Sequence, residues 1–333
     1  MKFTSLFENF TKTHVVVVGD VMLDTYWWGN VDRISPEAPV PIVSLQHKEL
    51  RVGGASNVAL NTASLGAKTT MISLLGADED GNILKRLMQE KHISTDYIIS
   101  SQQRITTNKT RIMGRNQQMM RLDAEVTNDL NEEQENLLIN SFIACIEKEK
   151  VDIVILEDYN KGVLTEKVIS SIIALCKAKN IPTAVDPKKK NFLSYKGVSL
   201  FKPNLKEVKE GLNITQVLPT ENSLSSVHDK LQSVLEHDIS LITLSEHGIF
   251  YKTNNKHSLI PTHVRNIADV SGAGDTVIAV ASLVLAASNN MQLAAEMANI
   301  AGGLVCEEVG TVAIDKDRLL RECTELLNES HLT

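Results

Sequence analysis

Short runs of aliphatic and β-branched residues recur along the chain, and segments with helical spacing separate most of them. Runs without polar alternation are typical of strands that are buried on both faces. The helical segments, of which residues 57–65 and 82–91 are two, carry apolar residues at every third or fourth position. Because strands alternate with helices, the pattern predicts an α/β fold with a mostly parallel sheet covered on both faces. The expected strands occupy residues 15–18, 70–75, 152–156, 183–185, 200–201 and 241–244.

Two stretches of mixed polarity, near residues 31–48 and 104–123, interrupt this alternation because no helix is indicated within them. We interpret them as extended segments of a small β-lid that projects from the main domain. Trp27 and Trp28 precede the first stretch, whose start is rich in proline, and this composition favours a rigid turn, an aromatic interface or an ordinary surface loop. No repeat, low-complexity tract or long linker is present, so we expect residues 1–333 to form a single domain with this lid.

Composition narrows the functional class. The 333 residues include 43% hydrophobic and 23% charged side chains, enough for a large core in a globular protein. A net charge of −7 argues against a nucleic-acid partner, because binding to a phosphate backbone normally needs a basic face. The four cysteines lie far apart without metal-ligand spacing and are expected to be reduced thiols. No apolar run approaches the ~18 residues that span a bilayer and no export signal is visible, so we expect a cytoplasmic protein without a membrane partner.

The strongest chemical signal is the string DVSGAGDT at residues 269–276, which precedes an almost wholly apolar segment that must be a buried helix. Gly272, Ala273 and Gly274 would leave backbone N–H groups exposed at the N-terminus of that helix, where unpaired donors and the helix dipole favour negative charge. This arrangement predicts an anion hole for a transferring phosphoryl group. Asp275 follows directly, where a carboxylate could take the proton of a hydroxyl group beside the anion hole.

A second glycine motif, GGASN, covers residues 53–57 and also precedes a helical segment. Gly53 and Gly54 would let a ligand approach the bare backbone, and Asn57 could bond a hydroxyl group. An alternative interpretation is purely structural, with Ser56 or Asn57 as the helix N-cap.

In their order and spacing, the two glycine motifs resemble those of the ribokinase (PfkB) family of carbohydrate kinases. The strings GDVMLD at 19–24, RISPEAPVP at 33–41, NQQ at 116–118 and MRLD at 120–123 are similar to the subgroup that phosphorylates D-glycero-D-manno-heptose 7-phosphate at its anomeric hydroxyl. The resemblance implies a ribokinase-like three-layer α/β/α sandwich and a cytoplasmic enzyme that uses ATP and Mg²⁺. Its product would be heptose 1,7-bisphosphate, an early intermediate toward ADP-heptose for the lipopolysaccharide core.

The same resemblance implies further features of the protein. Bifunctional relatives carry a nucleotidyltransferase domain with an HxGH motif, and the only similar string here, EHGI at residues 246–249, lacks the second histidine. We therefore expect no nucleotidyltransferase domain in this chain, with adenylyl transfer left to a separate protein. The family also suggests a homodimer formed through the β-lid.

The resemblance assigns roles to individual residues. Asp275 matches the catalytic base, and Gly272, Ala273 and Gly274 match the anion hole. Asn204 and Glu207 match an NxxE element in which Glu207 reaches Mg²⁺ through water, although a reciprocal helix cap would use the same two residues. The residues expected to bind the nucleotide are Lys188, Asn204, Glu207, Thr243, Ser245, Gly248 and Asn299.

The expected sugar ligands lie on the first strand edge, the glycine turn, the lid and the loop after residue 156. The phosphate of the substrate would need cations, which the lid supplies. The residues assigned to the substrate are Asp20, Asp24, Gly53, Gly54, Asn57, Lys109, Arg111, Arg121, Asp158 and Lys161, with Arg115 as a further lid cation. The chain departs from the subgroup pattern at Glu157, Asn160, Leu244 and Ser271, where serine, a small residue, arginine and threonine are more usual.

Two other functions stay open at this point. A kinase of the same fold could act on an unphosphorylated sugar, although the basic lid and the string at residues 33–41 weigh against it. A non-catalytic sugar- or nucleotide-binding protein could retain the scaffold, although it would have no need for a base at Asp275. A dinucleotide-dependent dehydrogenase is excluded because no GxGxxG follows the first strand.

Overall fold

The predicted buried strands form the central sheet of the computed structural model, which describes residues 2–114 and 117–327. Within these ranges the sheet has nine strands in the order β15-β14-β13-β12-β11-β10-β1-β4-β6. The strands from β13 to β6 are parallel, whereas β14 and β15 pair antiparallel at one edge. The strands are β1 (His14–Gly19), β4 (Lys68–Ile72), β6 (Ile93–Ser94), β10 (Ile153–Glu157), β11 (Thr183–Asp186), β12 (Leu200–Phe201), β13 (Ile239–Thr243), β14 (Ile249–Lys252) and β15 (His257–Ile260).

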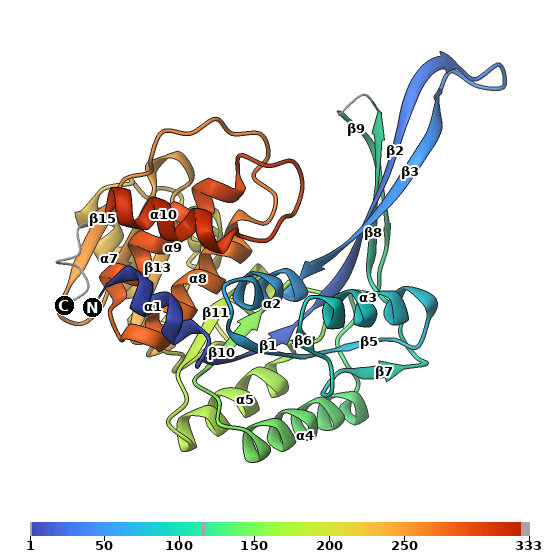
Figure 1. The fold of residues 1–333 in the computed structure, drawn as a ribbon. Coiled ribbons are helices and arrows are strands. Elements are labelled where there is room, and N and C mark those ends of the chain that lie inside the picture. The colour runs from blue at the N-terminus through green and yellow to red at the C-terminus, as the bar shows by residue number, and fades with distance from the viewer. Residues whose placement is uncertain (1, 115–116, 328–333) are drawn as a thin grey trace.

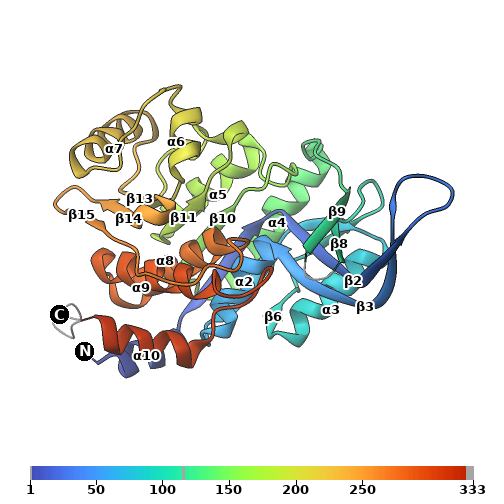
Figure 2. The same cartoon turned by 90° about the horizontal axis from the view of Figure 1, so that it is seen from above.

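Helices cover both faces of this sheet and complete a three-layer sandwich (Figures 1 and 2). In β1, Val15 and Val17 point into one core while Val16 and Val18 point into the other, as the two-residue period of a strand requires. The first core is covered by α1 (Phe3–Phe10), α2 (Ala55–Ser64), α3 (Glu79–Glu90), α8 (Ala273–Ser288), α9 (Met291–Val305) and α10 (Lys316–Leu326). The second is covered by α4 (Glu132–Lys148), α5 (Glu166–Ala178), α6 (Leu205–Gly211) and α7 (Glu221–Leu235). The expected α/β/α architecture is confirmed.

A separate four-stranded sheet projects from the body, at the upper right of Figure 1. Its order is β3-β2-β8-β9, and we call it the lid: β2 (Val21–Ile34), β3 (Pro41–Gly54), β8 (Asn108–Gly114) and β9 (Gln117–Ala124). The hairpin of β2 and β3 is longer than the segment expected near residues 31–48, because β2 begins only two residues after β1 ends. Trp27 and Trp28 lie inside β2, whereas Pro36 and Pro39 lie in the connection between β2 and β3, so the turn falls at the prolines and not at the tryptophans.

The apolar run at residues 70–75 was expected to be one strand, and this expectation is wrong. The run divides at Ser73 between β4 and β5 (Leu74–Gly76), and β5 pairs with β7 (Ile99–Ser101) in a two-stranded sheet. The Ser73 hydroxyl donates to the carbonyl of Gly19 at 2.7 Å, which fixes the break beside the end of β1. Two short 3₁₀ helices, η1 (Lys189–Asn191) and η2 (Ser245–His247), follow β11 and β13.

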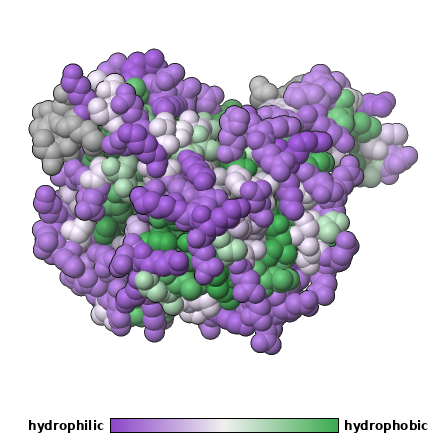
Figure 3. All heavy atoms as spheres, turned by 60° about the horizontal axis from the view of Figure 1, so that its bottom comes forward, coloured by the Kyte–Doolittle hydropathy of each residue, from purple (hydrophilic) through white to green (hydrophobic). Residues whose placement is uncertain are grey.

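On the face seen in Figure 3, hydrophilic side chains dominate and hydrophobic side chains gather in a limited central area. Among the described helices, none is both long enough and apolar enough to cross a bilayer.

Candidate active site

The glycine string at residues 269–276 builds the N-terminus of α8. Gly272 is the N-cap with φ of 80°, a left-handed conformation that favours glycine. A Cβ at this position would lie 3.0 Å from Nδ2 of the Asn57 side chain. The Ala273 amide that follows donates to the Val270 carbonyl at 3.3 Å, whereas the amides of Gly274 and Asp275 have no acceptor among the described residues. These amides and the helix dipole therefore form a site for negative charge, in the position that the sequence indicated.

Asp275 lies in the first turn of α8 and is 5% exposed. Its Oδ2 accepts a hydrogen bond from the side-chain amide of Asn57 at 2.7 Å, and its Oδ1 accepts one from the Tyr159 hydroxyl at 2.6 Å. The two glycine motifs thus meet at this carboxylate, because Asn57 lies in the first turn of α2. Burial raises the pKa of Asp275 to about 6, against the opposing effect of these two donors. A carboxylate with such a pKa is ionised at neutral pH and is a stronger base than an exposed aspartate.

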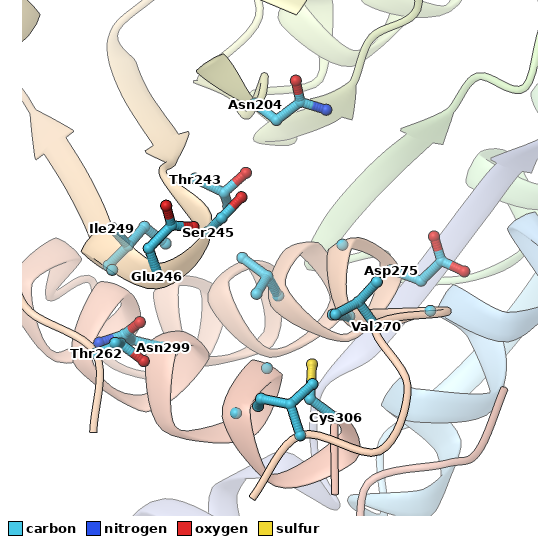
Figure 4. A pocket seen from close by; sticks show the side chains of 18 of the residues that line it. Asn204, Thr243, Ser245, Glu246, Ile249, Thr262, Val270, Asp275, Asn299 and Cys306 are labelled. Atoms are coloured by element: carbon cyan, nitrogen blue, oxygen red, sulfur yellow. The ribbon is translucent and has the colours of Figure 1, made fainter. Parts of the chain in front are cut away.

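A cleft of about 740 Å³ opens beside Asp275, a size suited to a small-molecule ligand. Figure 4 shows Asp275 at one side of this cleft, near the start of α8, and Asn299 at the other, with Thr243 and Ser245 on the wall between them. The predicted nucleotide residues that line it are Lys188, Asn204, Thr243, Ser245, Gly248 and Asn299, together with Gly272, Ala273, Gly274 and Asp275. Glu207 does not line the cleft itself but contacts Lys188, which does. The other residues predicted to bind the nucleotide therefore share one cleft, although 111 positions of the chain separate Lys188 from Asn299.

A buried ion-pair network forms the floor of this cleft. Asp186, at the end of β11, accepts from Lys188 Nζ at 3.0 Å and from Lys202 Nζ at 2.7 Å. Lys188 also contacts Glu207 at 2.8 Å. Although burial opposes the charge of Lys188, the carboxylates of Asp186 and Glu207 raise its pKa above the usual value, so it stays a cation. Two ammonium groups beside an anion hole suit a ligand that carries phosphates.

Sequence reasoning missed Asp186, Lys202 and Tyr159 as site residues. A usable signal existed, because Asp186 ends one buried strand, Lys202 directly follows another, and Tyr159 comes two residues after a third. Polar residues at the carboxyl ends of parallel strands meet at one edge of the sheet, where ligands bind in open α/β folds.

Asn204 and Glu207 form the reciprocal helix cap that was the alternative to their ligand role. The Asn204 side chain accepts from the Glu207 amide at 2.9 Å, and Glu207 Oε2 accepts from the Asn204 amide at 2.8 Å. Because Glu207 Oε1 is bonded to Lys188, both of its oxygens already have a donor. Each oxygen keeps a further lone pair, which could accept a hydrogen bond from a water bound to Mg²⁺.

The expected sugar side of the site lies where the lid joins the body. Asp24 of β2 is 3% exposed and forms an ion pair with Arg111 of β8. A Cβ on Gly53 would lie 2.2 Å from Asp24 Oδ2, so glycine at this position makes room for the carboxylate. Gly54 has φ of 60° and precedes α2 directly. Gly54 thus leads into the turn of α2 that carries Asn57, the residue bonded to Asp275.

Asp20 and Asp158 are engaged with the protein itself. Asp20 accepts from the backbone amides of Tyr159, Lys161 and Val163 at 2.9, 3.0 and 3.0 Å, and it lies outside the large cleft. Burial and the nearby Asp158 raise the pKa of Asp20 to about 6. Asp158 is 1% exposed and accepts from the Tyr195 hydroxyl at 2.7 Å. A sugar hydroxyl would have to compete with these donors, so the geometry favours a positioning role for both.

The basic residues assigned to the substrate differ in their partners. Arg121 is paired with Asp123 through two hydrogen bonds, and Lys161 is paired with Glu125 at 2.7 Å. The Lys109 ammonium makes no hydrogen bond or ion pair with the described residues, and burial followed by the charge of Lys161 lowers its pKa. Arg115 lies outside the described residues. Among the described basic residues assigned to the substrate, Lys109 is thus the one whose side chain has no anionic partner.

The comparisons with known proteins agree with this geometry. A family model described as pfkB family carbohydrate kinase matches residues 12–318. The D-beta-D-heptose 7-phosphate kinase of Bordetella bronchiseptica is 39% identical over 319 residues, which is 95% of this chain and 98% of that protein. The bifunctional protein HldE of Citrifermentans bemidjiense is 38% identical over 96% of this chain, and the match covers 65% of that protein. The chain thus spans just under two thirds of the length of such bifunctional relatives.

Solved structures share the fold. Phosphofructokinase-2 from Escherichia coli, in complex with potassium, superposes with a TM-score of 0.80 at 18% identity, covering 95% of this chain and 99% of that one. Arabidopsis thaliana ribokinase, complexed with ribose and ATP, gives a TM-score of 0.69 at 16% identity, covering 93% and 99%. With the family model spanning nearly the whole sequence, the chain belongs to the pfkB family of carbohydrate kinases.

Proposed function

We propose that the protein is an ATP-dependent kinase that phosphorylates the anomeric hydroxyl of D-glycero-D-manno-heptose 7-phosphate to give heptose 1,7-bisphosphate. The observation that carries the proposal is Asp275, a buried carboxylate with a pKa of about 6 that lies in the first turn of α8 beside a large cleft. The choice of substrate rests on the similarity to the Bordetella bronchiseptica enzyme over almost its full length. Because ATP is the donor, we place the reaction in the cytoplasm, on the route to ADP-heptose for lipopolysaccharide.

In this mechanism Asp275 accepts the proton of the anomeric hydroxyl of the sugar. The oxygen of that hydroxyl group attacks the γ-phosphorus of ATP. A new sugar O–P bond forms, the bond between the γ-phosphorus and the bridging oxygen breaks, and ADP leaves. The N-terminus of α8 would face the charge that spreads over the phosphoryl oxygens, and Lys188, which lines the same cleft, would neutralise phosphate charge. Asn57 and Tyr159 hold the two oxygens of the base in place.

ATP would occupy the cleft with its base toward Asn299 and its phosphates toward α8. Asn299 lies at the far side from Asp275 (Figure 4) and donates to the carbonyl of Pro261 at 2.8 Å. Thr243, Ser245 and Gly248 would contact the ribose and phosphates between these ends. Mg²⁺ would be held by ATP and by water bound to Glu207, and it would supply neutralisation of the phosphate charge.

We place the 7-phosphate of the sugar against Lys109. In the lid register Lys109 pairs with Asp24, and Arg111 pairs with Arg121, so these side chains share one face of the sheet. That face turns toward the body, since Arg51 of β3, opposite Asp24, donates to the carbonyl of Thr311 at 3.0 Å. A half-buried ammonium without a partner gains most from a dianionic phosphate.

The variant Lys109→Met is expected to raise KM for the sugar phosphate roughly tenfold or more with little change in kcat, because one charge-assisted contact is lost. Steady-state kinetics at saturating ATP measure this. Lys48→Met is the matched control, because Lys48 stacks on Trp27 on the opposite face of the lid. An unchanged KM in Lys109→Met would remove Lys109 from the phosphate site.

The outer face of the lid supports the proposed homodimer. Met120 and Leu122 are 55% and 49% exposed and pair with Ile112 and Thr110, so they lie on the face opposite Lys109. Burying such apolar side chains against a second copy would stabilise the lid. We expect light scattering to give the mass of two chains for the wild type and of one chain for a Met120→Glu, Leu122→Glu double variant. The variant Leu137→Glu, at an exposed position of α4, should remain dimeric. A monomeric wild type would contradict the dimer.

The substrate assignment is tested by release of ADP in the presence of heptose 7-phosphate, ribose, fructose and fructose 6-phosphate. The proposal predicts the highest kcat/KM for heptose 7-phosphate. A preference for ribose or fructose would point instead to a kinase of unphosphorylated sugars. Binding of ATP without ADP release from any sugar would support a non-catalytic protein on this scaffold.

A further inference from the structure

The carboxyl group of Glu157 occupies an unusual position behind the catalytic base. Glu157 ends β10, is 0% exposed, and neither of its carboxyl oxygens has a hydrogen-bond partner among the described residues. A buried carboxylate without any donor is costly, because it has lost its hydration and gained no partner in exchange. The mechanism proposed above gives this residue no task.

Glu157 is aimed at two other carboxyl groups. One oxygen from each of Glu157, Asp186 and Asp275 lies within 4.8 Å of the others, and all three residues are buried. Three negative charges this close cannot coexist without a compensating cation or proton. The contacts of each group decide how that compensation is arranged.

Asp186 and Asp275 are both provided with donors, but in different ways. Asp186 takes one ammonium on each oxygen, from Lys188 and Lys202, so its charge is fully compensated. Asp275 takes only the amide of Asn57 and the hydroxyl of Tyr159, so its hydrogen bonds leave its charge uncompensated. Glu157 has no donor at all and is therefore the group on which a proton is most stable.

Charged and titratable groups face Glu157 from several elements. Asp186 and Asp275 disfavour its ionisation, and Lys188 and Lys202 favour it. The hydroxyls of Tyr159 and Tyr195 are near enough to be affected by it. Burial is the largest influence, followed by the charges of Asp186 and Asp275, and the net result is a Glu157 pKa well above the usual value.

We propose that Glu157 is a positioning residue that stays protonated at neutral pH and donates a hydrogen bond to the ionised carboxylate of Asp275. Asp275 is the acceptor rather than Asp186 because its negative charge is the one that no ammonium compensates. The additional donor stabilises the ionised form of the base against the burial that opposes it. The inference rests on the proposed function, because it concerns the same base.

Two variants separate the proton donor from other roles. Glu157→Gln keeps an N–H donor of the same shape, whereas Glu157→Met has a similar size and no donor. The profile of kcat/KM against pH reports the ionisation of Asp275 in the free enzyme. We expect the acid limb of Glu157→Gln to coincide with that of the wild type, and the acid limb of Glu157→Met to move to higher pH by about one unit. At alkaline pH the two variants should reach similar rates.

Opposite shifts would overturn the proposal. If Glu157 were ionised in the working enzyme, Glu157→Gln would remove a negative charge and move the acid limb to lower pH. If the three carboxyl groups instead held a cation, Mn²⁺ added without nucleotide would bind the wild type and bind neither variant. An acid limb that stays in place in Glu157→Met would also reject the hydrogen bond to Asp275.

A measurement without turnover distinguishes failure of this inference from failure of the proposed function. The infrared difference spectrum of the wild type minus Glu157→Gln at neutral pH should contain the C=O band of a protonated carboxyl group, shifted in ²H₂O. If the band is present and no sugar supports ADP release, the protonation of Glu157 stands while the kinase assignment falls. If the band is absent, Glu157 is ionised and the inference is wrong, whatever the activity.

Discussion

The variant Asp275→Asn is expected to lose kcat by about a thousandfold or more, because the general base is removed while the shape of the site is kept. ADP release in a coupled assay measures the loss, and calorimetry of ATP binding should show an affinity within a few-fold of the wild type. The oxygen of the introduced side-chain amide can still accept from the Tyr159 hydroxyl. Asn57 can turn its own amide so that its oxygen faces the new N–H group, and the geometry is therefore maintained.

A surface variant controls for nonspecific effects of losing one carboxylate. Asp229→Asn changes an exposed residue of α7 that pairs with Lys252, and because neither residue lines the cleft, kcat should be unchanged. Turnover near the wild-type rate in Asp275→Asn would show that proton acceptance occurs elsewhere. The candidate would then be another carboxyl group of the cleft floor, and the assignment of Asp275 would be wrong.

The variant Lys202→Met is expected to lower the free energy of unfolding by about 3 kcal/mol, because it breaks a buried ion pair by removing one partner. Lys202 is 2% exposed, and its loss leaves Asp186 with Lys188 as the remaining ammonium. Equilibrium unfolding in urea measures the change through the transition midpoint, with the slope as a check that the unfolded state is unaltered.

The matched control is Lys206→Met, four residues further along the chain. The Lys206 side chain is 84% exposed and pairs with Glu210 within the same helix, so its removal should change stability by less than about 0.5 kcal/mol. Equal stabilities of the Lys202→Met variant and the wild type would mean that Lys188 alone satisfies Asp186. The two-lysine floor of the cleft would then have no stabilising role.

The sequence predicted the layers of the fold well, because buried parallel strands and amphipathic helices leave strong periodic signals. The run at residues 15–18 and the helix from residue 57 correspond to β1 and α2. The lid was harder to delimit, since Trp27 and Trp28 lie in a strand with one face toward the body and the other toward solvent. The break at Ser73 left no signal, because its apolar neighbours continue a buried run across two different sheets.

The sequence predicted the site best where the functional residues are neighbours in the chain. The glycines and Asp275 are consecutive, so their shared helix N-terminus could be inferred from spacing. The contact from Tyr159 to Asp275 joins residues 116 positions apart, and Lys202 reaches Asp186 from the next strand. Such contacts depend on strand order and side-chain direction, which a single sequence does not specify. The same reason explains why Asp20, placed at a strand edge, bonds to backbone amides in the structure.

Regiochemistry of the product tests the central claim most directly, since Asp275 is proposed to take the proton of the anomeric hydroxyl. Phosphorus NMR of the reaction of ATP with heptose 7-phosphate should show a second phosphomonoester coupled to the anomeric proton, formed in equal amount to ADP. ADP formed without a sugar phosphate ester, or a new ester at another hydroxyl of the sugar, would contradict the account.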